Sequence, residues 1–76
     1  MNFKKIEITT EFIRLDSFLK FAGITQTGGQ AKMIIEDQLV KVDGEICTQR
    51  GKKLYNGTKV EFVETNLGFE VVKIED

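Results

Sequence analysis

The stretch RLDSFLKFAGITQTGGQAKMIIEDQLVKVDG, residues 14–44, decides the fold of this chain. Its first part has apolar side chains at the i, i+3, i+4 and i+7 spacing of a helix that buries one face. The residues of this stripe are Leu15, Phe18, Leu19 and Ala22. Gly23 comes next, and a glycine in the left-handed conformation commonly ends a helix. The spacing therefore predicts a short first helix that ends at Gly23.

A second helix is predicted over about residues 28–37. Thr27 occupies its N-cap position and Gln30 follows three residues later, which is the spacing of a capping box. In such a box, each side chain accepts a hydrogen bond from a backbone N–H of the first turn. The apolar residues that share one face of this helix are Ala31, Ile34 and Ile35.

Two adjacent glycines, Gly28 and Gly29, stand in the first turn of this second helix. A glycine inside a helix costs about 0.5–1 kcal/mol relative to alanine, so their presence calls for an explanation. Two explanations are open at this point. The glycines permit close packing between helices, or they leave the free N–H groups of the helix start accessible to a phosphate.

Strand and turn signals flank the two helices. The alternation in residues 4–9, KKIEIT, predicts a strand, and Asp43-Gly44 between two alternating runs predicts a hairpin. Further predictions are a basic loop over residues 50–54, a turn at residues 56–57, and strands within residues 58–64 and 69–74. The order of strand, helix, helix and four strands is typical of an α+β domain, with two short helices beside a small, mostly antiparallel sheet.

The composition narrows the classes of function. The chain has no histidine, so the usual general base near neutral pH is missing. Its one cysteine, Cys47, supports neither an internal disulfide nor a common zinc site, and we expect it to be an inert residue in a strand. No apolar run approaches the ~20 residues that cross a bilayer. We therefore expect a cytoplasmic, non-enzymatic single domain over residues 1–76, without membrane contact, metal or cofactor.

The charges are distributed unevenly along the chain. Residues 14–59 contain eight basic and five acidic side chains, whereas residues 60–76 contain five acidic side chains and Lys73 alone as a base. A basic middle followed by an acidic tail indicates a charged partner surface.

Several pieces of the chain, in their order and spacing, resemble the S4 RNA-binding domain, a family named after a ribosomal protein. The matching pieces are Arg14-Leu15-Asp16 with Leu19, Ala31 with Ile35, Val40-Lys41-Val42-Asp43-Gly44, and Gly57-Thr58-Lys59-Val60. They cover about residues 12–63. The Gly-Gly-x-Ala-Lys sequence and the basic residues 50–53 are similar to the small stand-alone bacterial branch, the YaaA/YbcJ-like S4 proteins.

The resemblance implies an S4-like fold, the αL RNA-binding motif, in a monomer that binds structured RNA such as ribosomal or transfer RNA. The RNA is expected on the face made by the two helices and the following hairpin. The expected contact residues, converging on one basic face, are Arg14, Thr27, Gly28, Gly29, Gln30, Lys32, Lys41, Arg50, Lys52 and Lys53. The family usually has Ser-Arg where this chain has Thr27-Gly28, so one basic contact of the family pattern is missing.

Other interpretations stay open for the same residues. Arg14 can pair locally with Asp16, and residues 50–53 can be a solvated loop. The aromatic residues are expected in the core rather than as stacking surfaces: Phe12, Phe18, Phe21, Phe62 and Phe69, with Phe3 and Tyr55 packed in the core or at its edge. An alternative function is a protein-interaction module that keeps the fold but no longer binds RNA.

Overall fold

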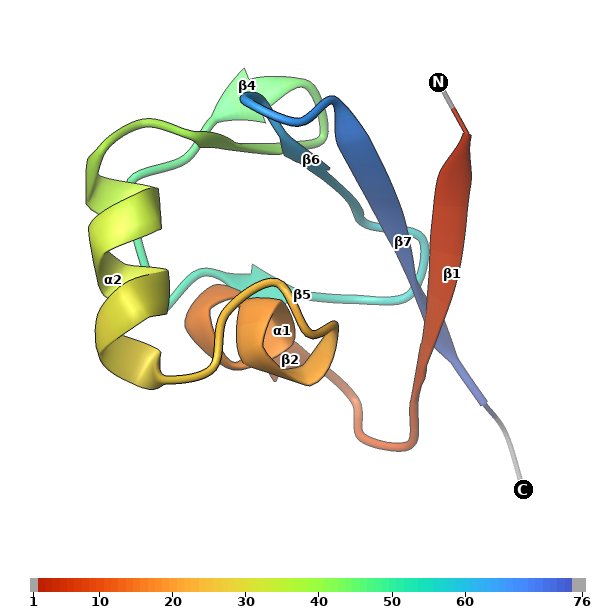
Figure 1. Ribbon diagram of the computed structural model, residues 1–76. Helices are drawn as coiled ribbons and strands as arrows, with labels where there is room; N and C mark the ends of the chain where they lie inside the picture. Colours follow the sequence, from red (N-terminus) through yellow and green to blue (C-terminus); the bar gives the residue numbers. More distant parts are fainter. Residues whose placement is uncertain (1, 75–76) are drawn as a thin grey trace.

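The computed structural model describes residues 2–74, which form two helices and seven strands (Figure 1). The helices are α1 (Leu15–Phe21) and α2 (Gly28–Glu36). The strands are β1 (Phe3–Ile8), β2 (Ile13–Arg14), β3 (Val40–Val42), β4 (Glu45–Ile46), β5 (Lys53–Leu54), β6 (Lys59–Phe62) and β7 (Leu67–Lys73). The α+β prediction is confirmed, and β2 and β5 are additions to the predicted order. Neither helix of residues 2–74 has the length of apolar surface that a membrane crossing needs.

Five strands form the main sheet in the order β1-β7-β6-β3-β4. The strand β1 runs parallel to β7, with Phe3 opposite Gly68 and Ile8 opposite Lys73, while the other neighbours are antiparallel. The hairpin between β3 and β4 turns at residues 43–44, whose φ angles of 51° and 88° suit the Asp-Gly pair. The mostly antiparallel sheet predicted from the sequence is thus confirmed.

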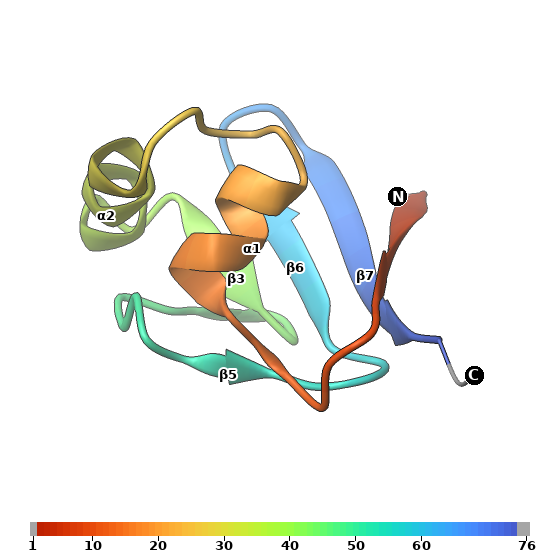
Figure 2. The ribbon, with the colours of Figure 1, turned by 90° about the horizontal axis from the view of Figure 1, so that it is seen from below.

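Both helices lie over one face of this sheet, and the core fills the space between them (Figures 1 and 2). The stripe residues Leu15, Phe18 and Leu19 of α1 are completely buried. The rings of Phe18 and Phe69 meet edge to face, with centroids 6.3 Å apart. The other buried apolar residues are Ile8, Ala31, Ile35, Val40, Val42, Leu54, Val60 and Val71.

A second, two-stranded sheet forms where β2 and β5 pair antiparallel, with Ile13 opposite Leu54 and Arg14 opposite Lys53. The side chain of Leu54 is completely buried in the core. Burial of Leu54 therefore keeps β5 beside β2, the segment that leads into α1. The prediction of a loop over residues 50–54 is wrong for its last two residues, which belong to β5.

Two aromatic residues expected in the core lie at the surface instead. Phe21 is 62% exposed, because it lies on α1 outside the stripe of apolar residues that faces the sheet. Phe12 is 37% exposed, because it precedes β2 and packs against the ring of Tyr55 at the surface. Tyr55, also expected in or at the edge of the core, is 48% exposed. The expectation of core packing is confirmed for Phe18, Phe62 and Phe69.

Candidate nucleic-acid interface

The start of α1 is held by the basic segment that precedes β5. The N–H of Leu15 donates to the carbonyl oxygen of Lys52 at 2.8 Å, and the N–H of Asp16 donates to that of Arg50 at 3.0 Å. The side chain of the N-cap residue Arg14 makes no capping hydrogen bond, so the two carbonyls satisfy N–H groups that a helix start leaves free. Together with the β2–β5 pairing, these bonds hold two chain segments side by side. The four basic residues of these segments, which we call the basic cluster, are Arg14, Arg50, Lys52 and Lys53.

The guanidinium group of Arg14 lies against this segment. A methyl group added at Gly51 would come within 3.6 Å of its Nη2 atom. The same atom is 3.2 Å from Oδ2 of Asp16, so the local pairing considered from the sequence is confirmed. The Arg14 side chain remains 52% exposed, and a guanidinium group has five N–H donors. Pairing with Asp16 therefore leaves donors available to a phosphate.

The start of α2 is open. Its N-cap Thr27 accepts a hydrogen bond from the N–H of Gln30 at 3.2 Å, as predicted. The reciprocal bond differs from the prediction, because Gln30 Oε1 accepts from the N–H of Gln26 at 2.8 Å rather than from Thr27. A side chain at Gly28 would meet no atom within 4 Å, and one at Gly29 only Thr27 Oγ1 at 3.9 Å. The explanation of the two glycines by close helix packing is therefore wrong.

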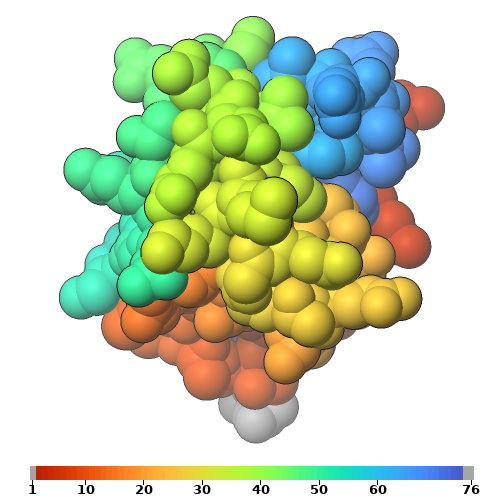
Figure 3. Space-filling model, turned by 60° about the vertical axis from the view of Figure 1, so that its left-hand side comes forward, coloured from red at the N-terminus to blue at the C-terminus, as the bar shows by residue number. Residues whose placement is uncertain are grey.

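The two helix starts differ in what they offer an anion. Carbonyl groups already occupy the N–H groups at the start of α1, whereas those of Gly28 and Gly29 have no acceptor among residues 2–74. Free N–H groups and the helix dipole favour a negative charge at such a position. Figure 3 shows α2 in yellow and green on the same face of the molecule as the teal segment that carries most of the basic cluster. Of the two helix starts, the one of α2 therefore remains free to meet an anion.

Lys32, one turn into α2, is exposed and 3.9 Å from Oε1 of Glu36. Both side chains are about half exposed, at 49% and 54%. An exposed pair of this kind contributes only about 0.3–0.5 kcal/mol, so Lys32 can exchange Glu36 for a phosphate at little cost.

Lys41 does not join the other cations. It lies in the middle of β3, between Val40 and Val42, which are both buried on the helix side of the sheet. Successive side chains of a strand point to opposite faces, so Lys41 lies on the face away from the helices. Its partners across the neighbouring strands are Ile46 and Glu61. The expectation that all predicted cations converge on one face is therefore wrong for Lys41.

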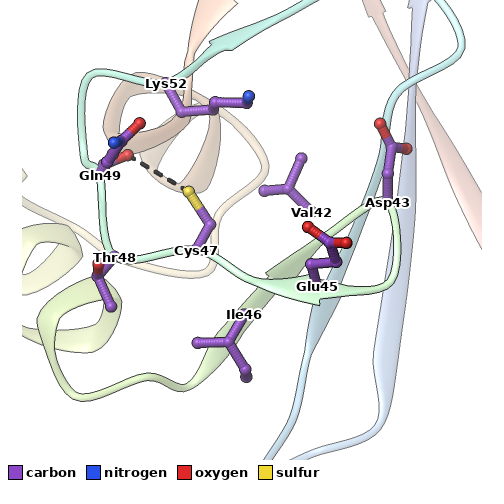
Figure 4. A pocket seen from close by; sticks show the side chains of 8 residues that line it. All are labelled: Val42, Asp43, Glu45, Ile46, Cys47, Thr48, Gln49 and Lys52. Carbon is purple, nitrogen blue, oxygen red and sulfur yellow. Dashed lines mark hydrogen bonds between the residues drawn. The ribbon is translucent and has the colours of Figure 1, made fainter.

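A hollow of about 480 Å³, not foreseen from the sequence, lies between the β3–β4 hairpin and the basic cluster (Figure 4). Asp43 and Glu45 line it from the hairpin, and Lys52 extends along its edge. Cys47 also lines it, half-buried and just after β4 rather than in a strand as expected, with Sγ 3.7 Å from the carbonyl oxygen of Gln49. The carboxylates of Asp43 and Glu45 repel phosphate, so the surface suited to RNA ends at this hollow.

The segment before β2 is anchored to β7. Nζ of Lys73 lies 2.7 Å from Oε2 of Glu11, and this hydrogen bond and the lysine charge hold the pKa of Glu11 below its usual range. A carboxylate with a lowered pKa contributes stability above its unfolded-state pKa and loses it as the pH falls through the folded-state value. The anchor is therefore intact at neutral pH.

Among residues 2–74, no three side chains of His, Cys, Asp or Glu gather as metal ligands.

Comparison with known proteins identifies the family of this chain. Residues 6–72 match the S4 domain family. A Bacillus subtilis protein named "Probable ribosome maturation protein RlbA" is 45% identical over 67 residues, which cover 88% of this chain and 93% of that protein.

The Escherichia coli protein YbcJ is 38% identical over 50 residues, 66% of this chain and 71% of YbcJ. Its solution structure, described as revealing an αL motif involved in RNA binding, matches with a TM-score of 0.68 and 30% identity over 95% of this chain and 90% of YbcJ. The fold is thus the αL architecture, with two helices on a mostly antiparallel sheet. The chain belongs to the S4 domain family.

Proposed function

We propose that this chain binds structured RNA, without catalysing a reaction, through the basic cluster and the open start of α2. The observation that carries the proposal is the pair of hydrogen bonds from the start of α1 to the carbonyls of Arg50 and Lys52. These bonds hold the cations of a surface segment in place beside an open helix start. The names of RlbA and the αL motif of YbcJ support an RNA partner, and a ribosome-related one in particular. A ribosomal RNA would place this chain in the bacterial cytoplasm.

Shape and phosphates suffice for such recognition. A folded RNA displays phosphates and 2′-hydroxyl groups in a regular geometry, so little base-specific chemistry is required. Arg14 contributes a planar group for bidentate phosphate contacts, and the lysines contribute point charges. The N–H groups of Gly28 and Gly29 can donate to a phosphate that comes close to the backbone, since no side chain intervenes. Thr27 and Gln30 keep this helix start in place through their hydrogen bonds.

The first test is the salt dependence of RNA binding. Each neutralised phosphate contributes about −0.7 to −0.9 to the slope of log affinity against log salt concentration. Four contacts from the basic cluster predict a slope of about −3 for a ribosomal RNA hairpin. Fluorescence anisotropy of the labelled hairpin at increasing salt gives this slope. A slope near zero contradicts binding through phosphates.

A second prediction concerns the basic residue that the S4 pattern has and this chain lacks. Gly28→Arg is expected to tighten RNA binding several-fold and to make the salt slope steeper by about 0.7–0.9, because it adds one phosphate contact. The position tolerates a side chain, since nothing lies within 4 Å of it. The same anisotropy titration measures both effects. The control is Gly28→Ala, which changes the helix start without adding a charge, and an equal gain for both variants would contradict the explanation.

A protein partner is the second candidate function. Phe21 on α1 and Met33 on α2 are 62% and 66% exposed, which provides apolar contacts outside the basic cluster. Affinity capture from a bacterial lysate with and without ribonuclease distinguishes the two functions. Association with ribosomal particles that ribonuclease abolishes favours RNA, and one protein that survives the nuclease favours a protein partner.

A further inference from the structure

The outer face of the small β2–β5 sheet carries a pattern of aromatic and basic side chains. Ile13 and Leu54, opposite each other, pack toward the core. Because side chains alternate along a strand, the residues on either side of this pair share the outer face. They are Phe12, Arg14, Lys53 and Tyr55.

The contacts on this face are direct. The ring centroids of Phe12 and Tyr55 are 6.0 Å apart, with planes inclined by 50°. Nζ of Lys53 lies 4.8 Å from the centroid of the Phe12 ring, a cation–π distance. Phe12 is 37% exposed and Tyr55 is 48% exposed, so neither aromatic ring is buried in the core.

The backbone around both rings is held in place. The N–H of Tyr55 donates to Thr58 Oγ1 at 3.1 Å, and its carbonyl oxygen accepts from the N–H of Thr58 at 3.0 Å. On the other side, Thr10 Oγ1 donates to the carbonyl oxygen of Phe12 at 2.8 Å. A preorganised surface loses less conformational entropy when a ligand binds.

From this juxtaposition we infer that Phe12 and Tyr55 form a stacking platform for one unpaired base of the bound RNA, with Tyr55 as its exposed face. The inference rests on the proposed function and adds to it a class of RNA, a duplex interrupted by an unpaired nucleotide. Every base has a π-face that stacks on an aromatic ring, so the platform requires no particular base. Arg14 and Lys53, on the same face, are placed for the phosphates that flank such a nucleotide. Their charges match an RNA better than the apolar surface of a protein.

The fluorescence of Tyr55 reports on stacking directly, because the chain contains one tyrosine and no tryptophan. The test compares an RNA hairpin containing a single unpaired adenosine with the same hairpin lacking it. We expect the bulged hairpin to quench the tyrosine emission and to bind about tenfold more tightly, within the range that one stacked base contributes. Anisotropy of the labelled hairpins gives the affinities, and tyrosine emission gives the stacking.

Variants assign the effect to the ring. Tyr55→Ala is expected to remove the preference for the bulged hairpin, and Tyr55→Phe to keep it. The matched control is Phe21→Ala, which removes an exposed aromatic ring at the opposite end of α1 and leaves the preference intact. Binding of both hairpins with equal affinity and no quenching overturns the stacking platform alone, as would a preference that survives Tyr55→Ala. Failure to bind either hairpin overturns the proposed function as well.

Discussion

Replacing Lys52 and Lys53 together with glutamate is expected to weaken binding to a structured RNA by about 100-fold at about 0.1 M salt. Each lost phosphate contact removes about 0.7–0.9 from the salt slope, equivalent to roughly five- to eightfold in affinity at that salt concentration relative to 1 M. Two contacts account for most of the loss, and repulsion between the new carboxylates and the RNA accounts for the rest. Both residues are exposed, so the fold is expected to persist. Anisotropy titrations at several salt concentrations measure the affinity and the slope.

The matched control is the double replacement Lys4→Glu and Lys5→Glu. These lysines are exposed on β1, at the opposite edge of the sheet from the β3–β4 hairpin, and Figure 1 shows β1 on the far side of the molecule from α2. Both double variants change the net charge by the same amount, so a difference between them reports on position. Equal losses of affinity would mean that net charge alone governs binding and that the basic cluster has no special role.

Replacing Phe18 with alanine is expected to destabilise the protein by about 3–5 kcal/mol, the usual cost of removing a buried phenyl ring. Phe18 is completely buried, and its ring meets that of Phe69. A domain of this size has a total stability of roughly 5–10 kcal/mol, so the variant is expected to lose a large share of its free energy of unfolding. Urea unfolding followed by circular dichroism gives the free energy of unfolding.

The same substitution at Phe21, three residues further along α1, is the control. Phe21 is 62% exposed, so Phe21→Ala is expected to change the stability by no more than about 0.5 kcal/mol. Comparing the two variants measures the effect of burial on stability, because both remove the same atoms from the same helix. A similar loss at both positions would contradict the placement of Phe18 in the core and of Phe21 at the surface.

Local signals in the sequence predict much of this fold. The stripe that includes Leu15, Phe18 and Leu19 identifies α1 and its buried face, because helical spacing and burial are directly linked. Thr27 identifies the start of α2 through a hydrogen bond that spans three residues. Asp43-Gly44 identifies the hairpin, because few residue pairs adopt two positive φ angles. In each case, the residues that interact are close together in the sequence.

Features that depend on distant pairings could not be predicted in this way. Strands β2 and β5 have two residues each, too few to display an alternation, and about 40 residues separate them. Without that pairing, the sequence indicates neither that the basic segment holds the start of α1 nor that Phe12 and Tyr55 meet. The sequence also does not predict the side of the sheet on which Lys41 lies, because that side depends on which face the helices cover. The candidate site was therefore predicted as a list of residues, and its geometry comes from the fold.

The parallel pairing of β1 with β7 has a consequence for synthesis of the protein. Residues 3–8 find their partners only in residues 68–73, so during translation the first strand has no neighbour until nearly the whole described chain has left the ribosome. Closing so long a loop is entropically costly, and contacts between distant residues slow folding. The nascent chain therefore completes its sheet late, and β1 stays unpaired until residues 68–73 have been synthesised.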